Sequence, residues 1–206
     1  MNDTKFACFL VEKDAADSRK AGKVRRGVAQ LTLNDLPAGD VVVRVAYSSL
    51  NYKDALAAQA NPGVVRKLPH VPGIDAAGTV VESSDPRFQA GQEVVVTGYE
   101  LGAPRWGGWS EFIRVPADWI VPLPAGLSLK ECMVLGTAGF TAAQCVHAIV
   151  LNGVRPDDGE ILVTGATGGV GCLALRLLAK LGYSVVAVTG KEKLKPKLYE
   201  WGAGGC

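Results

Sequence analysis

"ILVTGATGGVG" (161–171) joins an apolar run to a turn crowded with glycines, and it decides how the C-terminal part of the chain is interpreted. A segment of helix length, "CLALRLLAKLG" (172–182), follows the turn, and a second apolar run, "YSVVAVTGK" (183–191), comes next. We expect a strand, a helix and a parallel strand, which together begin a mononucleotide-binding half. Gly182 stands just after the last apolar residue of the helical segment, where a glycine commonly ends a helix.

The turn from Gly165 to Gly171 departs from the plain G-x-G-x-x-G spacing but keeps the residue types that phosphate binding requires. Glycine has no Cβ, so the backbone can turn tightly and approach a pyrophosphate closely. The helix that follows adds unpaired N–H groups and the positive end of its dipole. A tight strand-to-helix loop without any ligand is the alternative, and the flanking strand and amphipathic helix favour the dinucleotide site.

The end of the second apolar run indicates which dinucleotide is bound. An NAD site usually has an acidic residue about 20 residues after the glycine turn, where it holds the ribose 2′-hydroxyl. Here that place is taken by Lys191, preceded by Thr189 and Gly190. A lysine attracts a 2′-phosphate that an acid would repel, so the sequence favours NADP(H) over NAD. The alternative is that Lys191 is a solvated lysine at the start of a helix.

Residues 1 to about 125 are typical of short strands separated by turns. Within "VVVRVAYSSL" (41–50), Val41, Val43 and Val45 share one face of an extended chain. Further strand candidates, separated by Gly, Pro and Asp, are "GTVVES", "GQEVVVTG", "SEFIRVP" and "WIVPLP". This texture predicts an irregular β-barrel or sandwich.

The sequence pattern changes at Ser128, where residues that favour helices replace the alternation of apolar and polar residues. Ser128 and Glu131 form a capping-box pattern, which predicts the start of a helix. We therefore expect two domains, a β-rich one over 1–127 and an α/β one over 128–206, and a fold class of α/β plus β.

Composition and charge set limits on the partners. The chain has 206 residues, 48% of them hydrophobic, and a formal net charge of +2. This is ordinary globular composition, and it gives no reason to expect nucleic acid as the main partner. Five cysteines, none at metal-binding spacing, suit a cytoplasmic protein with reduced thiols. No apolar run has the length of a membrane span, and "FACFLV" near the start is too short for a signal peptide.

Several long motifs, taken together, resemble one family. They are "SSLNYKDALA" (48–57), "PHVPGIDAAGTV" (69–80), "DPRFQAGQEVVVTG" (85–98), "WGGWSEF" (106–112), "GTAGFTAA" (136–143) and "VRPDDGEILVTGATGGVG" (154–171). In this order they resemble the medium-chain dehydrogenase/reductase superfamily. Within it they are similar to the zinc-independent quinone oxidoreductase branch, in the acrylyl-CoA reductase (YhdH/AcuI-type) group. The match runs from about Val41 to Ala203, and residues 1–40 match only loosely.

The resemblance implies a GroES-like β-barrel catalytic domain followed by a Rossmann domain, a doubly wound parallel sheet. It implies reduction of an activated carbon–carbon double bond, such as that of the enoyl thioester acryloyl-CoA, with NADP(H) as cofactor. Reduction of a quinone is the alternative. It also implies a cytoplasmic protein that forms a homodimer when full length. Carried over by motif, Tyr52 faces the nicotinamide end of the cofactor. By the same resemblance, the pyrophosphate is expected to bind to Thr167, Gly168, Gly169 and Val170. The 2′-phosphate is expected to bind to Thr189, Gly190 and Lys191.

The resemblance also bears on zinc. Zinc-dependent members place a Cys where Asn51 falls and a His-Glu pair where Ile74 and Asp75 fall, and they add a lobe with four clustered cysteines. This chain has none of these residues, and catalytic zinc needs about three protein ligands. His70 and His147 are each expected to be a surface histidine or a hydrogen-bonded buried one rather than a ligand. We therefore expect no metal.

Without a metal, the substrate must be activated by hydrogen bonds. Asn51, Tyr52 and Asp54 place an amide, a phenol and a carboxylate within one short segment. We expect Tyr52 to line the catalytic cleft and Asn51 and Asp54 to orient the reacting groups. The alternative is that Asn51 and Asp54 only hold the turn after the preceding strand. Trp106 and Trp109 are interpreted as core residues, with a substrate platform as the alternative.

The last interpretation concerns the extent of the chain. A Rossmann sheet of this kind has six strands in the order 3-2-1-4-5-6, and the sequence supplies the first two. We therefore expect a chain truncated at the C-terminus, without the segment that returns to the catalytic domain. Two further hypotheses from other classes stay open at this point. One is a non-catalytic nucleotide-binding or structural protein, and the other is a nucleic-acid binder that uses the basic clusters at 18–26 and 191–197.

Overall fold

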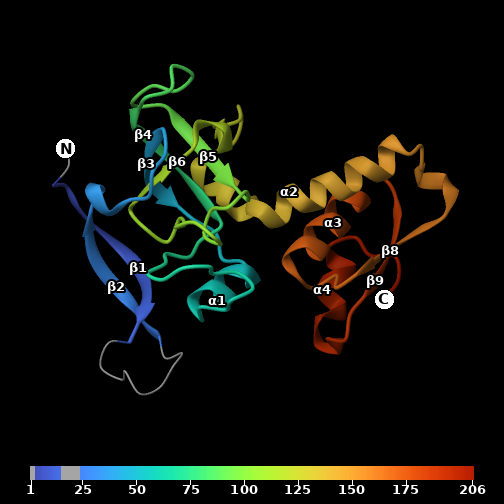
Figure 1. Cartoon of the computed structure of the whole chain (residues 1–206). Coiled ribbons are helices and arrows are strands. Elements are labelled where there is room, and N and C mark those ends of the chain that lie inside the picture. The colour runs from blue at the N-terminus through green and yellow to red at the C-terminus, as the bar shows by residue number, and fades with distance from the viewer. Residues whose placement is uncertain (1–2, 15–23) are drawn as a thin grey trace. The chain divides into compact units, whose positions relative to one another are not determined.

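The computed structural model describes residues 3–14 and 24–206, so most of the basic cluster at 18–26 lies outside the described part. The chain forms two compact units, Met1–Gly136 and Thr137–Cys206 (Figure 1). The predicted domain boundary at 127/128 lies just before helix α2 (Leu129–Leu151), whereas the compact units divide within that helix. The domain assignment itself stays a prediction.

The N-terminal unit is built almost entirely of strands. Its elements are β1 (Lys5–Lys13), β2 (Val24–Thr32), η1 (Leu33–Asp35), β3 (Val41–Tyr47), α1 (Tyr52–Ala58), β4 (Asp75–Ser83), β5 (Glu93–Thr97), β6 (Phe112–Val115), η2 (Ala117–Trp119) and β7 (Ile120–Pro122). The first two strands form an antiparallel hairpin, and the other five form an antiparallel sheet in the order β6-β3-β4-β5-β7. The strand candidates quoted from the sequence are therefore confirmed, while β1, β2 and α1 had not been singled out.

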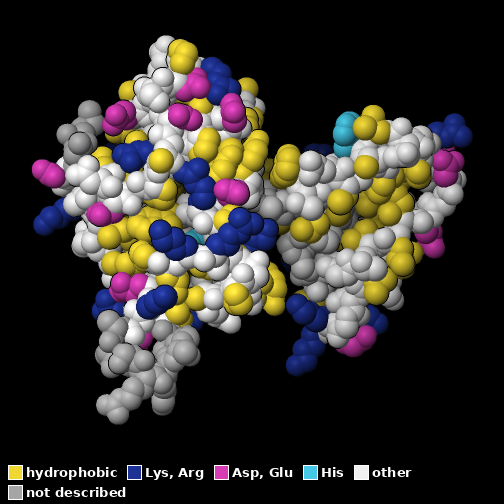
Figure 2. All heavy atoms as spheres, viewed as in Figure 1, with side chains coloured by type: hydrophobic (Ala, Val, Ile, Leu, Met, Phe, Trp, Pro, Cys, Tyr) yellow, Lys and Arg dark blue, Asp and Glu magenta, His cyan; other side chains and the backbone are white. Residues whose placement is uncertain are grey.

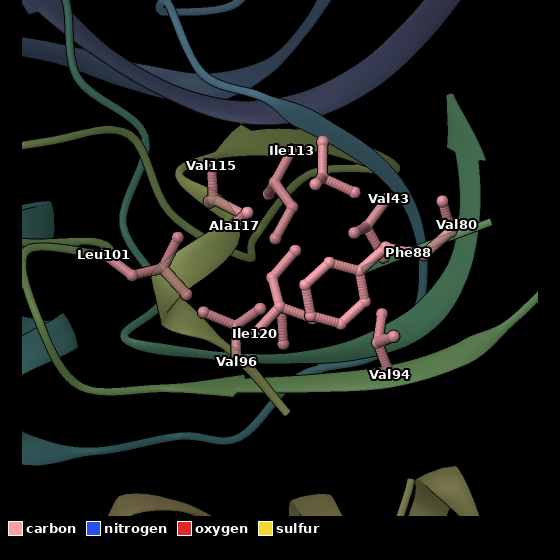
Figure 3. Close-up of a cluster of buried hydrophobic side chains, with 12 residues drawn as sticks. Val43, Val80, Phe88, Val94, Val96, Leu101, Ile113, Val115, Ala117 and Ile120 are labelled. Atoms are coloured by element: carbon pink, nitrogen blue, oxygen red, sulfur yellow. The ribbon is translucent and has the colours of Figure 1, made fainter. Parts of the chain in front are cut away.

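The core of this unit explains why β3 reads as a nearly continuous apolar run. Val41 and Val43 belong to one hydrophobic cluster with Val80 and Val94, and all four are buried. Figure 3 shows Val43, Val80 and Val94 in this cluster. Val42, between them, packs into a second cluster on the other side. Successive side chains of a strand point to opposite faces, so a strand that is covered on both faces needs apolar residues at every position.

Helix α2 begins where the capping box predicted. The backbone N–H and the hydroxyl of Ser128 both donate to Glu131 Oε2, at 2.9 and 2.7 Å, and the Glu131 N–H donates to Ser128 Oγ at 3.2 Å. The helix is interrupted at Gly136, whose backbone angles are φ 53° and ψ −158°. A Cβ at Gly136 would lie 2.6 Å from Ser49 Oγ and 2.7 Å from Asp75 Oδ2, so only glycine fits this break.

One property of α2 differs from the expectation that no segment has the length and polarity of a membrane span. Leu129–Leu151 is long and apolar enough to cross a membrane by length and composition, with a mean hydropathy of 1.6. The core helix of a soluble protein passes the same test, and the break at Gly136 divides the apolar stretch into two helical pieces.

The C-terminal unit has the predicted strand–helix–strand order. Its elements after α2 are η3 (Pro156–Asp158), β8 (Glu160–Thr164), α3 (Gly169–Lys180), β9 (Ser184–Val188), η4 (Glu192–Leu194) and α4 (Lys195–Glu200). Strands β8 and β9 pair in parallel, and α3 packs against them through Leu175 and Leu178. Gly182 has φ 86° and follows the helix end, which confirms its predicted place. Near the chain end, Gly205 forms a parallel bridge with Val186, so β9 has backbone partners on both edges.

A contact of three glycines organises the loops of the N-terminal unit. A Cβ built on Gly102 would overlap the backbone of Gly73, and a Cβ built on Gly107 would overlap the backbones of both Gly73 and Gly102. Three chain segments therefore touch through their main chains. The N–H of Gly107 donates to Val71 O at 2.7 Å, which fixes the segment that leads into β4.

Candidate functional site

The glycine turn between β8 and α3 is closed by its own backbone. Gly165 has φ 60°, a conformation that favours glycine, and the Gly168 N–H donates to Gly165 O at 2.8 Å. A Cβ on Gly171 would overlap that same carbonyl oxygen, so the helix packs against the turn at contact distance. The Ala166 N–H donates to Val188 O at 3.2 Å and ties the turn to the end of β9.

The turn leaves a set of backbone donors unused. The Cys172 N–H donates to Gly168 O at 2.9 Å and is the first amide of α3 with a backbone acceptor. Among the described residues, no hydrogen bond joins the N–H groups of Gly169, Val170 or Gly171 to an acceptor. Free N–H groups at the start of a 12-residue helix form an anion site. Of the predicted pyrophosphate residues, Gly169 and Val170 have free N–H groups that suit a phosphate, whereas the Gly168 N–H is used within the turn. Gly171 adds a free N–H group that was not predicted.

The predicted 2′-phosphate residues lie beside this turn. The Lys191 N–H donates to Thr189 Oγ1 at 3.0 Å, and Thr189 Oγ1 lies 3.4 Å from Thr167 Oγ1. These two contacts bring the end of β9 together with the glycine turn. The Lys191 side chain is exposed, and no ion pair joins it to another described residue. The neighbouring carboxylate, Glu192, pairs instead with Lys195 at 2.9 Å, so it does not neutralise Lys191.

The second group of predicted residues lies in the N-terminal unit, before and within α1. Asp54 is fully buried. Its Oδ2 accepts the Asn51 N–H at 2.7 Å, and its Oδ1 accepts the Ile74 N–H at 2.8 Å. Burial raises the pKa of Asp54; the two N–H donors oppose this shift, and the nearby charge of Asp75 adds to it. This geometry is that of a carboxylate that holds two loops together.

Asn51 connects Asp54 to a second buried carboxylate. Asn51 Nδ2 donates to Asp75 Oδ2 at 2.8 Å, and Asp75 is also fully buried. The hydroxyl of Ser48 donates to the backbone oxygen of Asp75 at 2.7 Å. Sequence reasoning assigned no role to Asp75, although the acid at this position was noted in the comparison with zinc-dependent members. The available signal was the position of Asp75, which directly follows Ile74, the residue whose N–H Asp54 accepts.

Tyr52 differs from its neighbours. It is the first residue of α1 and is 81% exposed, and no hydrogen bond joins its hydroxyl to another described residue. The structure thus brings Asn51, Asp54 and Asp75 together and directs the Tyr52 ring to solvent. An exposed phenol next to a buried polar network can meet a ligand, and a buried carboxylate with its oxygens occupied cannot. The cleft-lining role of Tyr52 and the orienting roles of Asn51 and Asp54 stay predictions.

The two tryptophans of "WGGWSEF" are half-buried and pack against the cluster that contains Phe6 and Val71. Trp109 Nε1 donates to Ser49 O at 3.2 Å, and Trp106 Nε1 donates to Pro69 O at 2.9 Å. Both indoles therefore belong to the wall of the core, and Trp106 also lines a cavity.

The structure distinguishes the two histidines. His70 is buried, its Nε2 lies 3.2 Å from Gly102 O, and burial lowers its pKa. His147 is exposed. Within residues 3–14 and 24–206, no group of three or more His, Cys, Asp or Glu side chains is placed to hold a metal ion.

Comparison with known proteins places this geometry in a family. Residues 37–125 match the alcohol dehydrogenase GroES-like domain. The chain is 52% identical over 200 residues to YhfP of Bacillus subtilis, which carries a provisional quinone oxidoreductase name, and 50% identical over 198 residues to the acrylyl-CoA reductase AcuI of Ruegeria pomeroyi. These matches cover 97% and 96% of the chain.

Solved structures give the same result. The YhdH oxidoreductase of Salmonella enterica, crystallised with NADP, has a TM-score of 0.91 and 51% identity, over 97% of this chain. YhfP of B. subtilis, crystallised with NAD, has a TM-score of 0.91 over 98% of this chain. The chain belongs to the medium-chain dehydrogenase/reductase superfamily. Within that superfamily, its relatives at about half identity are the YhfP and acrylyl-CoA reductase proteins.

The family confirms the predicted fold class, a GroES-like domain followed by part of a Rossmann domain. The chain spans 59% of the length of the curated relatives YhfP and AcuI and 60% of the Salmonella structure. The activity of the whole protein is therefore a matter of proposal.

Proposed function

We propose that the protein is an NADPH-dependent oxidoreductase that reduces the activated carbon–carbon double bond of an enoyl thioester. The observation that carries the proposal is the pair of anion sites in the C-terminal unit: three free N–H groups at the start of α3, and an unpaired Lys191 at the end of β9. The names of the Ruegeria and Salmonella relatives support it, since they denote an acrylyl-CoA reductase and an oxidoreductase with NADP.

The residues fit NADP(H) better than NAD. The N–H groups of Gly169, Val170 and Gly171 would hold the pyrophosphate, and Lys191 with Thr189 would hold the 2′-phosphate. When bound, the cofactor supplies a hydride to the β-carbon of the substrate. The NAD in the YhfP structure shows that a relative accepts the other dinucleotide, so the preference of this chain needs its own measurement.

The N-terminal unit would handle the charge that develops on the substrate. Reduction of an enoyl thioester at its β-carbon places negative charge on the thioester oxygen, which hydrogen-bond donors must stabilise. Asn51 Nδ2 gives one hydrogen to Asp75, and no described residue accepts the other. Tyr52 presents its phenolic hydroxyl, a hydrogen-bond donor, on an exposed ring that can reach a ligand. Asp54 acts through position, because it fixes the backbone of Asn51.

Zinc is not part of the proposal. The residues at the places where zinc-dependent members carry ligands are Asn51 and Ile74, and neither a carboxamide nor an alkyl chain is a usual zinc ligand. Activation by hydrogen bonds is sufficient in principle for an enoyl thioester, whose carbonyl already polarises the double bond.

A quinone is the second candidate substrate. It is favoured by the names of YhfP and of a more distant relative of this chain, the quinone oxidoreductase of Mus musculus. We propose to assay the full-length protein with NADPH and NADH against acryloyl-CoA and a panel of quinones. Faster NADPH oxidation with acryloyl-CoA, at comparable concentrations, supports the proposal. Turnover of quinones alone would identify the protein as a quinone reductase. The absence of turnover with either substrate would favour a non-catalytic nucleotide-binding or structural protein.

A further inference from the structure

A cavity of about 540 Å³ lies in the N-terminal unit, and neither Asn51 nor Asp54 lines it. Its size falls in the range of small-molecule sites. It is formed by the β1–β2 hairpin, the η1 loop, the segment before His70 and the segment after Ala103. The lining residues are Leu10, Leu31, Asp35, Pro37, Lys67, Pro69, Pro104, Arg105 and Trp106.

The apolar wall is rigid. Leu10, Leu31 and Trp106 pack against the buried cluster that contains Phe6 and Val71. The Trp106 ring is held in place because its Nε1–H donates to Pro69 O at 2.9 Å. A fixed indole among prolines and leucines offers a flat apolar surface, which suits an aromatic ring such as a nucleobase.

The polar groups give the cavity a positive side. Arg105 is held by a hydrogen bond to Ala38 O and by the ring of Trp119, whose centroid lies 5.2 Å from the Arg105 Cζ. These contacts leave most of its five N–H donors for a ligand. Lys67 is exposed, and no hydrogen bond or ion pair joins it to another described residue. Figure 2 shows Lys and Arg side chains gathered on this unit.

One carboxylate also lines the cavity, and it is already engaged. Asp35 Oδ2 accepts the N–H and the hydroxyl of Thr32, both at 2.8 Å. These bonds lower the pKa of Asp35, so it stays ionised. Its charge disfavours a phosphate at the η1 side, and an anionic group is therefore expected on the side of Lys67 and Arg105.

The cavity is connected to the Asn51–Asp54 network by one short stretch of chain. Pro69 lines the cavity, and Ile74, five residues on, donates its N–H to Asp54. Five residues span at most about 18 Å, since an extended chain covers 3.3–3.6 Å per residue. A ligand with a long flexible arm can therefore occupy the cavity with one end and lie near Asn51 with the other.

We propose that this cavity binds the phosphorylated adenosine end of a coenzyme A thioester, with the base against Trp106 and a phosphate on Lys67 and Arg105. The inference rests on the proposed function, because it names the part of that substrate which the N-terminal unit recognises. A quinone has neither phosphate nor purine, so the same cavity would give the protein a means of preferring the thioester.

Direct binding provides the first test. Adenosine 3′,5′-bisphosphate is titrated into the full-length protein while the indole N–H resonances of its tryptophans are followed by NMR, with Trp106→Phe used for assignment. We expect the Trp106 resonance to move and the Trp201 resonance of the C-terminal unit to stay. Movement of Trp201 alone, or of neither, overturns the proposal.

A matched pair of variants provides the second test. Lys67→Ala should weaken binding of adenosine 3′,5′-bisphosphate about tenfold, as expected for one charge-assisted contact. Arg66→Ala removes the same charge from an exposed neighbour that does not line the cavity, and it should leave binding unchanged. Equal losses in the two variants would indicate a general charge effect and overturn the proposal.

Kinetics separate this inference from the proposed function. Lys67→Ala should raise the KM for acryloyl-CoA about tenfold, with kcat and the KM for a quinone unchanged. Reduction of acryloyl-CoA with a KM that Lys67→Ala does not alter would overturn the cavity assignment and keep the proposed function. If the unsubstituted protein reduces only quinones, the proposed function fails, and the Trp106 resonance still decides whether the cavity binds the nucleotide.

Discussion

The buried carboxylate of Asp54 accepts the backbone N–H of Ile74 at 2.8 Å, so the first turn of α1 is tied to the residue that precedes β4. Asp54→Ala should lower the free energy of unfolding by about 2–6 kcal/mol, because the half-buried N–H of Asn51 and the buried N–H of Ile74 lose their acceptor at about 1–3 kcal/mol each. Urea unfolding monitored by circular dichroism measures this loss. Lys53→Ala, at an exposed position of the same helix, is the control and should change stability by less than about 0.5 kcal/mol.

The same carboxylate has a pH signature. Burial raises the pKa of Asp54, so its contribution to stability is full below the ordinary carboxyl pKa and is lost as the pH rises through the raised value. Relative to Asp54→Asn, which does not titrate, the unsubstituted protein should be more stable at acidic than at neutral pH. If the unfolding free energy of the unsubstituted protein rises with pH relative to that of Asp54→Asn, the raised pKa and the buried state of Asp54 are contradicted.

Lys191→Asp should weaken NADPH binding by one to two decades, because it removes a charge-assisted contact to phosphate worth roughly 1.5–3 kcal/mol. Fluorescence titration of NADPH measures the change. Lys193→Asp introduces the same charge change at an exposed lysine two residues away and should have the smaller effect. Tight binding of NADH to the unsubstituted protein, equal to that of NADPH, would show that the end of β9 does not select the cofactor.

Gly171→Ala should destabilise the C-terminal unit by about 1–3 kcal/mol, because the new methyl group overlaps the carbonyl oxygen of Gly165. Gly190→Ala is the matched control. A Cβ there meets no atom within 4 Å, so we expect a change of less than about 0.5 kcal/mol. Thermal unfolding of both variants decides the point, and equal melting temperatures would mean that α3 can move away from the turn.

The five cysteines should differ in their reactivity. Burial, assisted by the charge of Asp35, raises the pKa of Cys8 to about 11, and burial also raises the pKa of Cys132. Cys145 and Cys206 are exposed. At pH 8 a thiol reagent should label the two exposed cysteines first, since the thiolate is the reactive form. Peptide mass spectrometry gives the order, and early labelling of Cys8 would contradict its burial.

Activity of the full-length protein should not depend on a metal ion. Asn51 and Ile74 occupy the places where zinc-dependent relatives of the superfamily carry ligands, and neither supplies a zinc-binding atom of the usual kind. Prolonged dialysis against a chelator should leave the rate of NADPH oxidation unchanged. A loss that zinc alone restores would require a site that the described residues do not form.

The C-terminal unit could be predicted closely because its signals are local. The apolar run of β8, the glycines of the turn and the position of Gly182 each specify the backbone of a few residues, and the structure contains all three features. The capping box at Ser128 is of the same kind. In each case the physical cause lies within about four residues of the element it determines.

The remaining features of the fold and of the candidate site depend on contacts between residues that are far apart in the sequence, or on elements with weak local patterns. Asn51 and Asp75 are hydrogen-bonded across 24 positions of sequence, and no local pattern indicates that a carboxamide will meet that particular acid. The hairpin of β1 and β2 was missed because several of its side chains stay exposed, and its apolar pattern is accordingly weak. Helix α1 was missed because a helix of seven residues has too few periods to be visible in a sequence.

The contact of Gly73, Gly102 and Gly107 restricts how the sequence of this chain can change. The backbone of Gly73 occupies the space that a side chain on Gly102 or on Gly107 would need, and the backbone of Gly102 also blocks a side chain on Gly107. A second substitution cannot restore room, because a glycine has no atoms left to give up. A mutation at Gly102 or Gly107 therefore cannot be compensated by a second substitution within the contact, and these two positions stay fixed while the loops around them change.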